Sequence, residues 1–389
     1  MANLYKVTKE TVKCEIARIA YLLSKPFFKQ KVWLFCETED QAQENGYTLY
    51  RWVKDNKPEI RSYYVLGENS PVYDKLVEDK CILRSSSIAQ YFYLFHSSII
   101  ASTHGLWCLP DGLGIQKKIN RKVLRAQKVM LNHGLCFLKN GKNFYHKDVF
   151  ALNDHMTALS EKHKAIFTDL YGYDSSEVSI TGYPRLDKML DSSQEHDNYV
   201  LIMPTFRDGE QRLGSKFVQT DLYKNIEAFL LDQSVKKSLI EHDLKILIYL
   251  HQDNQDSTDC FRPLENDRVR VVKQGEFSVT ELLSMSKLLI TDYSSVLFDF
   301  IYMEKPFISY QFDRERFLAS REHKPIIDIG KDLPGKTVDT HTQLVDTYMQ
   351  YVCSNFTMEQ EYKDKISDYF LYRDTNNCQR VFELLSKLQ

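Results

Sequence analysis

The sequence lacks long hydrophobic runs, both along the chain and at its beginning. No stretch of about 18 uncharged apolar residues occurs, so we expect no helix to span a membrane. The opening residues, "MANLYKVTKETVKCEIARIAYLLSK", lack the short apolar stretch followed by small residues that a cleavable secretion signal requires. We therefore expect the protein to stay in the compartment where it is made.

Paired cysteines and an excess of one charge are also missing. The eight cysteines are scattered, without a C-x-x-C pair or a histidine partner at zinc-finger spacing. This pattern favours reduced thiols in a cytoplasmic protein. The formal net charge of −2 offers no general attraction for nucleic acid, so an anionic ligand must be met by a local cluster of donors.

The chain does have the composition and the patterning of a large α/β protein. Its 389 residues are 43% hydrophobic and 27% charged, which suits two globular domains. Strand-like segments such as "KVWLFCE" alternate with helix-like segments, and this alternation predicts doubly wound parallel sheets. The polar stretch "DSSQEHDN" predicts a linker. We expect a helical segment over 1–30 and two Rossmann-like domains, over 31–193 and 194–389, facing a central cleft.

Polar residues that directly follow a strand are the first candidates for a site, because open parallel sheets bind ligands beyond the carboxyl ends of their strands. In "LLITDYSSVLFDF", Asp292 ends a strand, and Ser294 and Ser295 stand where the next helix is expected to begin. Hydroxyls and free backbone N–H groups at that place suit a phosphate, although serine there also serves as an ordinary N-cap. Asp299 lies between two phenylalanines, which favours a hydrogen bond to a ribose or another hydroxylated ligand over a surface position.

Two histidines are candidates for acid–base chemistry. His133 follows an apolar strand and precedes Gly134, and His251 ends the strand "LKILIYLH". Imidazole titrates near neutral pH, so His133 suits a general base that takes a proton from an alcohol; a buried histidine in a turn is the alternative. We expect the two histidines to end corresponding strands of the two halves.

Two arginines stand at strand exits beside the predicted linker. Arg185 lies in "GYPRLD" and Arg207 in "PTFR". A guanidinium binds phosphate in a bidentate manner, so both are candidate phosphate ligands, with surface ion pairs as the alternative.

In order and spacing, the motifs "HG", "GYPRLD", "PTFR", "LH" and "TDYSSVLFDF…KPFISYQFD" resemble the CDP-glycerol glycerophosphotransferase family, which contains the teichoic acid primases and polymerases and related capsule enzymes. The resemblance covers residues 90–330. It implies a GT-B-like fold with an N-terminal acceptor domain and a C-terminal CDP-donor domain. It also implies transfer of glycerol phosphate, or ribitol phosphate, from a CDP-activated donor to a lipid-linked acceptor.

The resemblance also implies roles for individual residues. The family's two functional histidines match His133 and His251. Its donor-binding segments match Gly134, Leu135, Cys136, Phe137, Arg185, Thr205, Phe206, Tyr249, Leu250, Ser294, Ser295 and Asp299, to which we add Arg207 and Asp292 from their strand-end positions. The chain departs from the family with "NHGLC" in place of Trp-His-Gly-Thr-Pro, "HQ" in place of His-Pro, and Tyr249 where an arginine is frequent. The resemblance therefore specifies the reaction type more firmly than the substrate.

In the expected reaction His133 takes the proton of the acceptor hydroxyl and CMP leaves. His251, Arg185 and the two serines stabilise the diphosphate. We expect neither a metal ligand set nor a tightly bound cofactor, and leave open a divalent ion carried by the diphosphate. A CDP-ribitol transferase, a glycosyltransferase that uses a nucleotide sugar, and a scaffold without catalysis are the alternatives.

The N-terminal segment is a candidate membrane contact. Basic residues surround a set of apolar residues that recur at helical spacing. The apolar residues are Val12, Ile16, Ile19, Ala20 and Leu23. Such a helix can lie on the inner surface of the bacterial cell membrane, where a lipid-linked acceptor would be found. The alternative is that the same stripe packs against the first domain.

Overall fold

The computed structural model describes residues 2–29, 31–104, 125–148, 153–321 and 324–389. The chain divides into two compact units. The first comprises Met1–Gly134, Gly141–Lys188 and Phe370–Gln389, and the second comprises Leu135–Asn140 and Met189–Tyr369. This division differs from the expected single boundary at residue 193 in two respects. Residues Phe370–Gln389 belong to the first unit, and the short segment Leu135–Asn140 belongs to the second unit.

The first unit contains a seven-stranded parallel sheet in the order β3-β2-β1-β4-β5-β6-β7. All five residues of β1 are buried, as expected of a strand covered on both faces. The order reverses between the neighbouring strands β1 and β4, which makes their carboxyl ends the switch point of this sheet. The strands are β1 (Val32–Cys36), β2 (Arg61–Leu66), β3 (Ile82–Arg84), β4 (Ser97–Ser102), β5 (Gln127–Met130), β6 (His155–Ala158) and β7 (Val178–Ile180).

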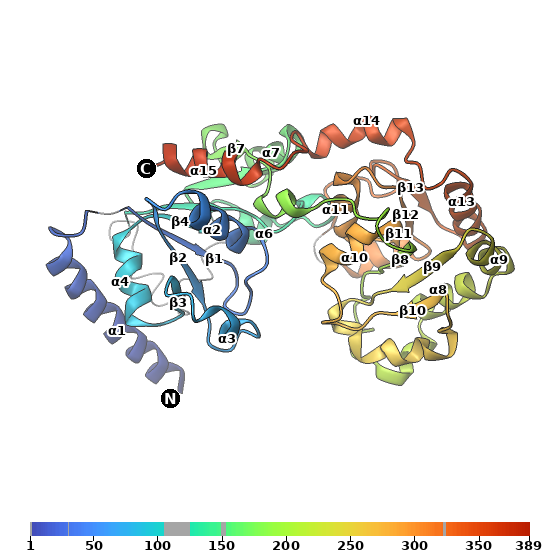
Figure 1. Cartoon of the computed structure of the whole chain (residues 1–389), viewed down its shortest axis with the longest axis horizontal. Helices are drawn as coiled ribbons and strands as arrows, with labels where there is room; N and C mark the ends of the chain where they lie inside the picture. The colour runs from blue at the N-terminus through green and yellow to red at the C-terminus, as the bar shows by residue number, and fades with distance from the viewer. Residues whose placement is uncertain (1, 30, 105–124, 149–152, 322–323) are drawn as a thin grey trace. The chain divides into compact units, whose positions relative to one another are not determined.

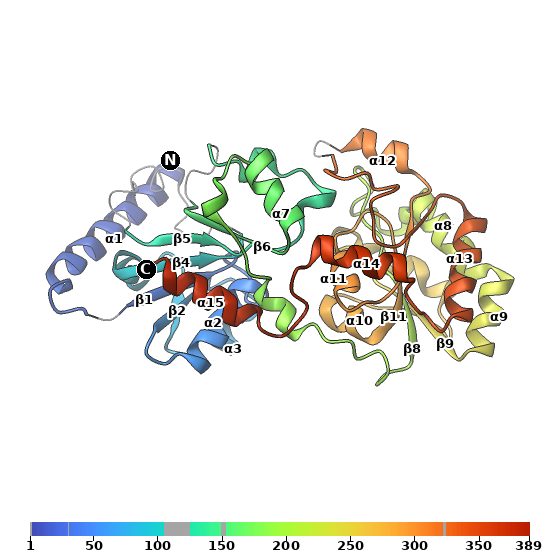
Figure 2. The same ribbon diagram turned by 90° about the horizontal axis from the view of Figure 1, so that it is seen from above.

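Alternate residues of β1 face two separate cores. Val32 and Leu34 pack with residues of α1 and α4, whereas Trp33 and Phe35 pack with residues of α2 and α15. The first pair of helices is labelled in Figure 1, and α2 and α15 lie side by side in Figure 2. The helices of this unit are α1 (Ala2–Ser24), α2 (Asn45–Asn56), α3 (Tyr73–Leu76), α4 (Ile88–His96), α6 (Lys142–Tyr145), α7 (Glu161–Ala165) and α15 (Asn377–Lys387).

A single carboxylate fixes the return of the C-terminal helix to the first unit. Asp187 accepts hydrogen bonds of 2.8 Å from the backbone amides of Asn377 and Cys378, at the start of α15. An acidic group at a helix N-terminus satisfies amides that have no partner inside the helix. Asp187 of the "GYPRLD" motif therefore anchors the fold.

The second unit contains a six-stranded parallel sheet in the order β10-β9-β8-β11-β12-β13, with its switch point between β8 and β11. Renumbered from its own first strand, this is the 3-2-1-4-5-6 order of dinucleotide-binding folds, with which the first sheet also begins. The prediction of two Rossmann-like sheets is thus confirmed. The strands are β8 (Asn198–Ile202), β9 (Leu244–Ile248), β10 (Val269–Val271), β11 (Ser286–Thr291), β12 (Phe307–Tyr310) and β13 (Lys336–Val338).

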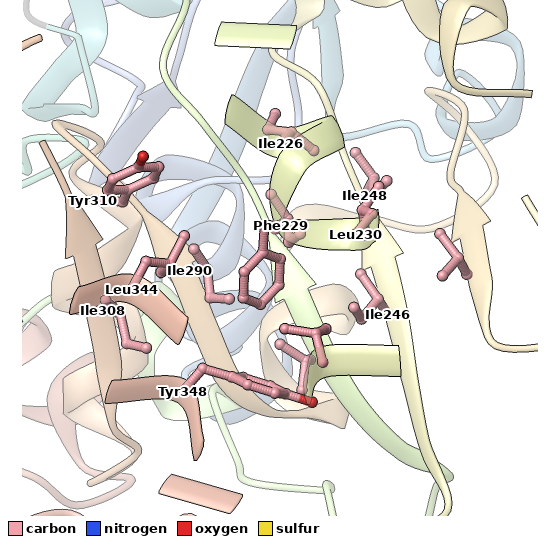
Figure 3. Packing of buried hydrophobic residues seen from close by; sticks show 14 of the residues in the cluster. Ile226, Phe229, Leu230, Ile246, Ile248, Ile290, Ile308, Tyr310, Leu344 and Tyr348 are labelled. Carbon is pink, nitrogen blue, oxygen red and sulfur yellow. The ribbon is translucent and has the colours of Figure 1, made fainter. Parts of the chain in front are cut away.

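Isoleucines of β9, β11 and β12 pack against aromatic and aliphatic side chains of α8 and α13 on one face of this sheet (Figure 3). Two consecutive helices, α8 and α9, form between Asp221 and Glu241. The side chain of Asp232 accepts hydrogen bonds from Ser234 and Val235 and so begins a new helix there. The helices are α8 (Asp221–Leu231), α9 (Gln233–Glu241), α10 (Val279–Met285), α11 (Val296–Tyr302), α12 (Arg314–Ser320), α13 (His341–Cys353) and α14 (Gln360–Tyr369).

The cysteines differ in one respect from the expectation of reduced thiols throughout. Cys36 is disulfide-bonded, whereas Cys14, Cys81, Cys136, Cys260, Cys353 and Cys378 are free. Cys108 lies outside the described residues. Sequence spacing does not reveal a disulfide of this kind, because the fold decides which cysteines come close. Within the described part of the chain, no helix has the length and hydrophobicity needed to cross a bilayer.

Candidate functional site

The switch point of the second sheet brings together the residues that follow β8 and β11. The hydroxyl of Thr291 donates to the carbonyl of Met203 at 2.7 Å. The backbone amide of Thr205 donates to Oδ1 of Asp292 at 2.9 Å. Two of the predicted motifs, "PTFR" and "TDYSS", therefore lie side by side at the carboxyl end of the sheet. Ligands bind at this place in open α/β sheets.

Arg207 and two carboxylates form a buried group beneath these loops. Nη1 of Arg207 lies 2.9 Å from Oδ2 of Asp292, and its Nε lies 2.7 Å from Oδ2 of Asp313. Burial opposes ionisation of Asp313, but hydrogen bonds from Arg207, Arg316 and Tyr293 outweigh it and lower the pKa of that carboxyl. The sequence predicts that Arg207 offers its guanidinium to a phosphate. The structure instead gives Arg207 two buried partners, so its role is to hold the loops together.

Three hydroxyls lie above this buried group. The Oγ1 atom of Thr205 is buried and has no hydrogen-bond partner in the described part of the chain. Among the described residues, Ser294 accepts only a long contact of 3.5 Å, from the amide of Val296. Exposed Ser295 precedes α11 without a side-chain cap bond to that helix. The alternative of an ordinary N-cap is therefore not what Ser295 does here. These hydroxyls are arranged so that they can donate to an anionic ligand.

Asp299 lies on α11, one turn beyond Ser295, and is half-buried, while its neighbours in sequence, Phe298 and Phe300, are buried. It therefore lies on the helix that leaves the switch point. We keep its contact with a ribose as a prediction.

His251 lies three residues beyond the end of β9 and begins the 3₁₀ helix Gln252–Leu264. Its Nδ1 atom accepts a hydrogen bond of 3.2 Å from the amide of Asp253, so the neutral imidazole carries its proton on Nε2. Burial lowers the pKa of His251, and the nearby Arg321 lowers it further, while Asp253 acts in the opposite direction. His251 is thus held as a neutral hydrogen-bond donor.

The two residues before His251 are part of the core. Leu250 is fully buried within the main hydrophobic cluster, and burial raises the pKa of Tyr249. Leu135 and Phe137 are also buried, and the ring centroids of Phe137 and Phe298 are 5.7 Å apart. These matches to the family's donor-binding segments therefore lie in the packing that supports the site.

His133 follows β5 in the first unit. The preceding Asn132 adopts a positive φ of 56° and donates from its side chain to the carbonyl of Thr157 at 2.7 Å. The His133 side chain is exposed, which excludes the alternative of a buried turn histidine. The space beside Gly134 is open, since a Cβ at that position would meet no heavy atom within 4 Å. A ligand can therefore approach the backbone beside His133.

A second histidine, which the sequence did not reveal as a candidate, stacks on His133. The ring centroids of His104 and His133 are 4.8 Å apart and the rings are nearly parallel. His104 follows β4, the neighbour of β5, and burial lowers its pKa although Asp40 opposes this effect. The segment "STHG" repeats the strand–His–Gly pattern of "LNHG", which is the signal that would have found it.

The two predicted catalytic histidines do not end corresponding strands. His133 follows the fifth strand of the first unit, whereas His251 follows β9, the second strand of its own sheet. The expectation that the two histidines follow corresponding strands is wrong. An apolar strand followed by a histidine occurs in both units, but this pattern does not indicate the strand's place in its sheet.

Arg185 has partners at the start of α2. Its amide donates to Oδ1 of Asn45 at 3.0 Å, and its Nε lies 3.3 Å from Oε2 of Glu44. The same helix start is occupied by Glu37, whose carboxylate accepts backbone hydrogen bonds from Gln43, Glu44 and Tyr47. A dinucleotide would place its pyrophosphate at this first helix of a Rossmann fold. In this chain the protein's own carboxylate fills that position.

No group of three or more His, Cys, Asp or Glu side chains is arranged to hold a metal ion within the residues that the structure describes.

The chain matches a protein family over almost its entire length. A model of the family described as CDP-Glycerol:Poly(glycerophosphate) glycerophosphotransferase matches residues 17–387. The chain is 25% identical over 389 residues to the minor teichoic acid biosynthesis protein GgaB of Bacillus subtilis (strain 168), with 97% of this chain and 42% of that protein covered. It is 27% identical over 213 residues to the teichoic acid glycerol-phosphate transferase of Staphylococcus aureus (strain NCTC 8325 / PS 47), with 51% of each covered. The chain thus spans about half the length of these relatives.

Solved structures resemble the chain over both units. The wall teichoic acid polymerase TagF matches with a TM-score of 0.70 and 18% identity, covering 99% of this chain and 96% of that one. A histidine-to-asparagine variant of TagF soaked with CDPG matches with a TM-score of 0.68. The UDP-GlcNAc 2-epimerase of Neisseria meningitidis, bound to UDP-GlcNAc, matches with a TM-score of 0.56 and 12% identity over 92% of this chain and 100% of that one. These matches confirm the prediction of a GT-B-like α/β fold.

Proposed function

We propose that this chain, which belongs to the CDP-glycerol:poly(glycerophosphate) glycerophosphotransferase family, transfers glycerol phosphate from CDP-glycerol to a hydroxyl of a lipid-linked acceptor. Family membership supports a transferase reaction, and the names of the relatives support a role in teichoic acid biosynthesis. The observation that carries the proposal is the cluster of hydroxyls at the switch point of the second sheet. Thr205, Ser294 and Ser295 are not occupied by structural hydrogen bonds of normal length in the described part of the chain, and the donor's diphosphate would accept from them.

The reaction exchanges one phosphorus–oxygen bond for another. The acceptor oxygen forms a bond to the phosphorus that carries the glycerol, and the bond from this phosphorus to the bridging oxygen of CMP breaks. His133 takes the proton of the acceptor hydroxyl. The Nε2–H of His251 donates to the phosphate oxygens as negative charge moves onto the leaving CMP.

The polyol and the acceptor are further parts of this proposal. Glycerol phosphate is our first choice because it gives the family its description, and ribitol phosphate is the alternative. A nucleotide sugar is the alternative donor from a different reaction class, since a UDP-GlcNAc enzyme resembles the fold. The occupied helix start at Glu37 in the first unit supports the second unit as the nucleotide-binding one.

We further propose that the protein docks on the inner membrane surface through α1. One face of the helix, with Cys14 and Ala17, packs into the first unit, while the predicted apolar stripe points to solvent. Ile16 is 47% exposed and Leu23 is 72% exposed. Unpartnered apolar residues on a helix with basic neighbours suit the boundary between headgroups and acyl chains.

The test is to incubate the protein separately with CDP-glycerol, CDP-ribitol and a UDP-activated sugar, each with a lipid-linked acceptor, and to measure nucleotide release. We expect acceptor-dependent release of CMP from CDP-glycerol. Faster release from CDP-ribitol would change the polyol and keep the reaction type. Release of UDP from the sugar nucleotide, with no CMP from either CDP compound, would overturn the proposal.

A further inference from the structure

Arg321 is a cation at the second unit's switch point that neither the motifs nor the strand-end rule identified. It directly follows α12. Its guanidinium carbon lies 4.7 Å from the ring centroid of Phe206 and 4.5 Å from that of Phe317, so two aromatic rings contact the group. Stacking of this kind fixes the plane of a guanidinium without using its N–H groups.

The hydrogen bonds of Arg321 leave donors available. Nη2 donates to the carbonyl of Phe206 at 3.1 Å, and Nη1 donates to Oδ1 of Asp208 at 3.3 Å. A guanidinium carries five N–H groups, and these two bonds are the polar partners of Arg321 within the described residues. Asp208 is 41% exposed, so solvent screens its charge. Arg321 therefore keeps most of its capacity to bind an anion.

The contrast with Arg207 shows that the two arginines have different roles. The side chain of Arg207 is 5% exposed and lies against two buried carboxylates, whereas that of Arg321 is 20% exposed and has one partly solvated carboxylate. Only Arg321 combines a fixed orientation with unused N–H groups. Arg321 is therefore more accessible to a phosphate than Arg207 is.

Arg321 belongs to the same local cluster as the candidate donor site. Phe206, which covers one face of its guanidinium, follows Thr205 and contacts the ring of His251 at 4.7 Å. The positive charge of Arg321 is also close enough to lower the pKa of His251. Phe206, from the loop after β8, thus contacts both Arg321 and His251, and Phe317 of α12 contacts Arg321 as well.

We infer that Arg321 binds the diphosphate of the nucleotide donor and neutralises the charge that develops on the leaving nucleotide. The inference rests on the proposed function and adds a ligand to it. The guanidinium edge presents parallel N–H groups that fit two phosphate oxygens, while Thr205, Ser294 and Ser295 supply neutral hydroxyls. Phe206 links this cation to His251, so both would act on the same phosphates.

The experiment compares Arg321→Gln and Arg321→Lys with Arg314→Gln. Arg314 is a matched control because it lies on α12 but donates to Gln311 and Asp339. We expect Arg321→Gln to weaken equilibrium binding of CDP-glycerol about ten- to hundredfold, with a smaller loss for CMP. Arg321→Lys should fall between, because it keeps the charge and loses the bidentate edge. Arg314→Gln should bind as the unmodified protein does.

A second readout separates ligand binding from a merely structural role. The groups that face His251 are Asp253, Arg321 and the ring of Phe206. Removing the positive charge of Arg321 should raise the pKa of His251, which NMR titration of the imidazole measures without any ligand. A Tm equal to that of Arg314→Gln would show that the variant is folded.

The outcomes distinguish this inference from the proposed function. Tight binding of CDP-glycerol by Arg321→Gln, at the level of the Arg314→Gln control, would overturn the role of Arg321 and leave the proposed function intact. If the unmodified protein binds a UDP-activated sugar instead, and Arg321→Gln loses that binding, the diphosphate role holds and the proposed donor is wrong. If the unmodified protein binds neither nucleotide, both ideas are wrong.

Discussion

The amide of Thr205 donates to the carboxylate of Asp292 at 2.9 Å, and this hydrogen bond ties together the loops that follow β8 and β11. The same oxygen accepts from the amide of Tyr293, and the side chain is 3% exposed. Asp292 is therefore a positioning residue that sets the spacing of the hydroxyls around it. Arg207 balances its charge in the interior.

Asp292→Asn should lower the free energy of unfolding by about 3 kcal/mol, because it leaves Arg207 with one buried carboxylate in place of two. Denaturant titration measures this change. Asp267→Asn, at an exposed position of the same unit, is the control and should change stability by less than about 0.5 kcal/mol. Equal stability of the two variants would show that Asp292 does not hold the loops.

Replacing both Ser294 and Ser295 by alanine should weaken binding of the CDP-activated donor by about 2–4 kcal/mol, since two hydrogen bonds to a charged group are lost. The two hydroxyls make no short hydrogen bond to any residue that the structure describes, so the variant should unfold at nearly the same temperature as the unmodified protein. Isothermal titration with CDP-glycerol gives the affinity. An unchanged affinity in the folded double variant would remove both serines from the site.

His133→Ala should reduce turnover by about two to four orders of magnitude and leave donor affinity unchanged, because a general base acts on the acceptor hydroxyl and not on donor binding. The control is His242→Ala, at an exposed histidine of the second unit. Near-normal turnover in His133→Ala together with an inactive His251→Ala would mean that the roles of the two histidines are reversed.

The buried His163 predicts loss of stability in acid. Burial lowers its pKa to about 3 from the ordinary value of 6.5. As the pH falls below 6.5, the unfolded chain takes up a proton that the folded chain refuses, so the free energy of unfolding falls by about 1.4 kcal/mol per pH unit. This contribution is fully present above pH 6.5 and decreases until the pH reaches about 3.

His163→Gln tests this effect, since glutamine keeps an acceptor for the amide of Leu159, which donates to Nδ1 at 3.3 Å, and does not titrate. Its unfolding free energy should depend less steeply on pH between 6.5 and 4.5 than that of the unmodified protein. Identical slopes would show that other groups cause the acid sensitivity.

The apolar stripe of α1 predicts binding to anionic membranes. Phe27, which follows the helix, is 85% exposed, whereas Phe28 stacks on His96 and is part of the first unit. Ile16→Gln combined with Leu23→Gln should abolish flotation with anionic liposomes, because apolar area at the interface is lost. The control is Ile240→Gln, which removes a 68% exposed isoleucine from α9.

High salt should weaken flotation of the unmodified protein in part, since basic residues contribute along with the stripe. A full-length protein that stays with the soluble fraction at low and high salt, or a double variant that floats as well as the control, would show that α1 is not the membrane contact.

Local sequence determined the elements that carry the site. A continuous apolar run such as "VWLFC" has no soluble face, so it predicts a strand covered on both sides, and the polar residues that end "LLIT" must then stand at a sheet edge. The positions of Thr205, Ser294, Ser295 and His251 beyond their strands follow from this pattern alone.

Only the tertiary structure decided which of these residues can meet a ligand. Arg207 and Arg321 have the same side chain, and the sequence favoured Arg207 because it follows a strand. Asp292 and Asp313 approach Arg207 from distant parts of the chain and occupy it, whereas two aromatic rings fix Arg321 and leave its N–H groups available. Whether a charged group is available to bind a ligand depends on its neighbours in space. For both arginines these neighbours come from segments about a hundred residues away in the sequence, so tertiary packing decides them.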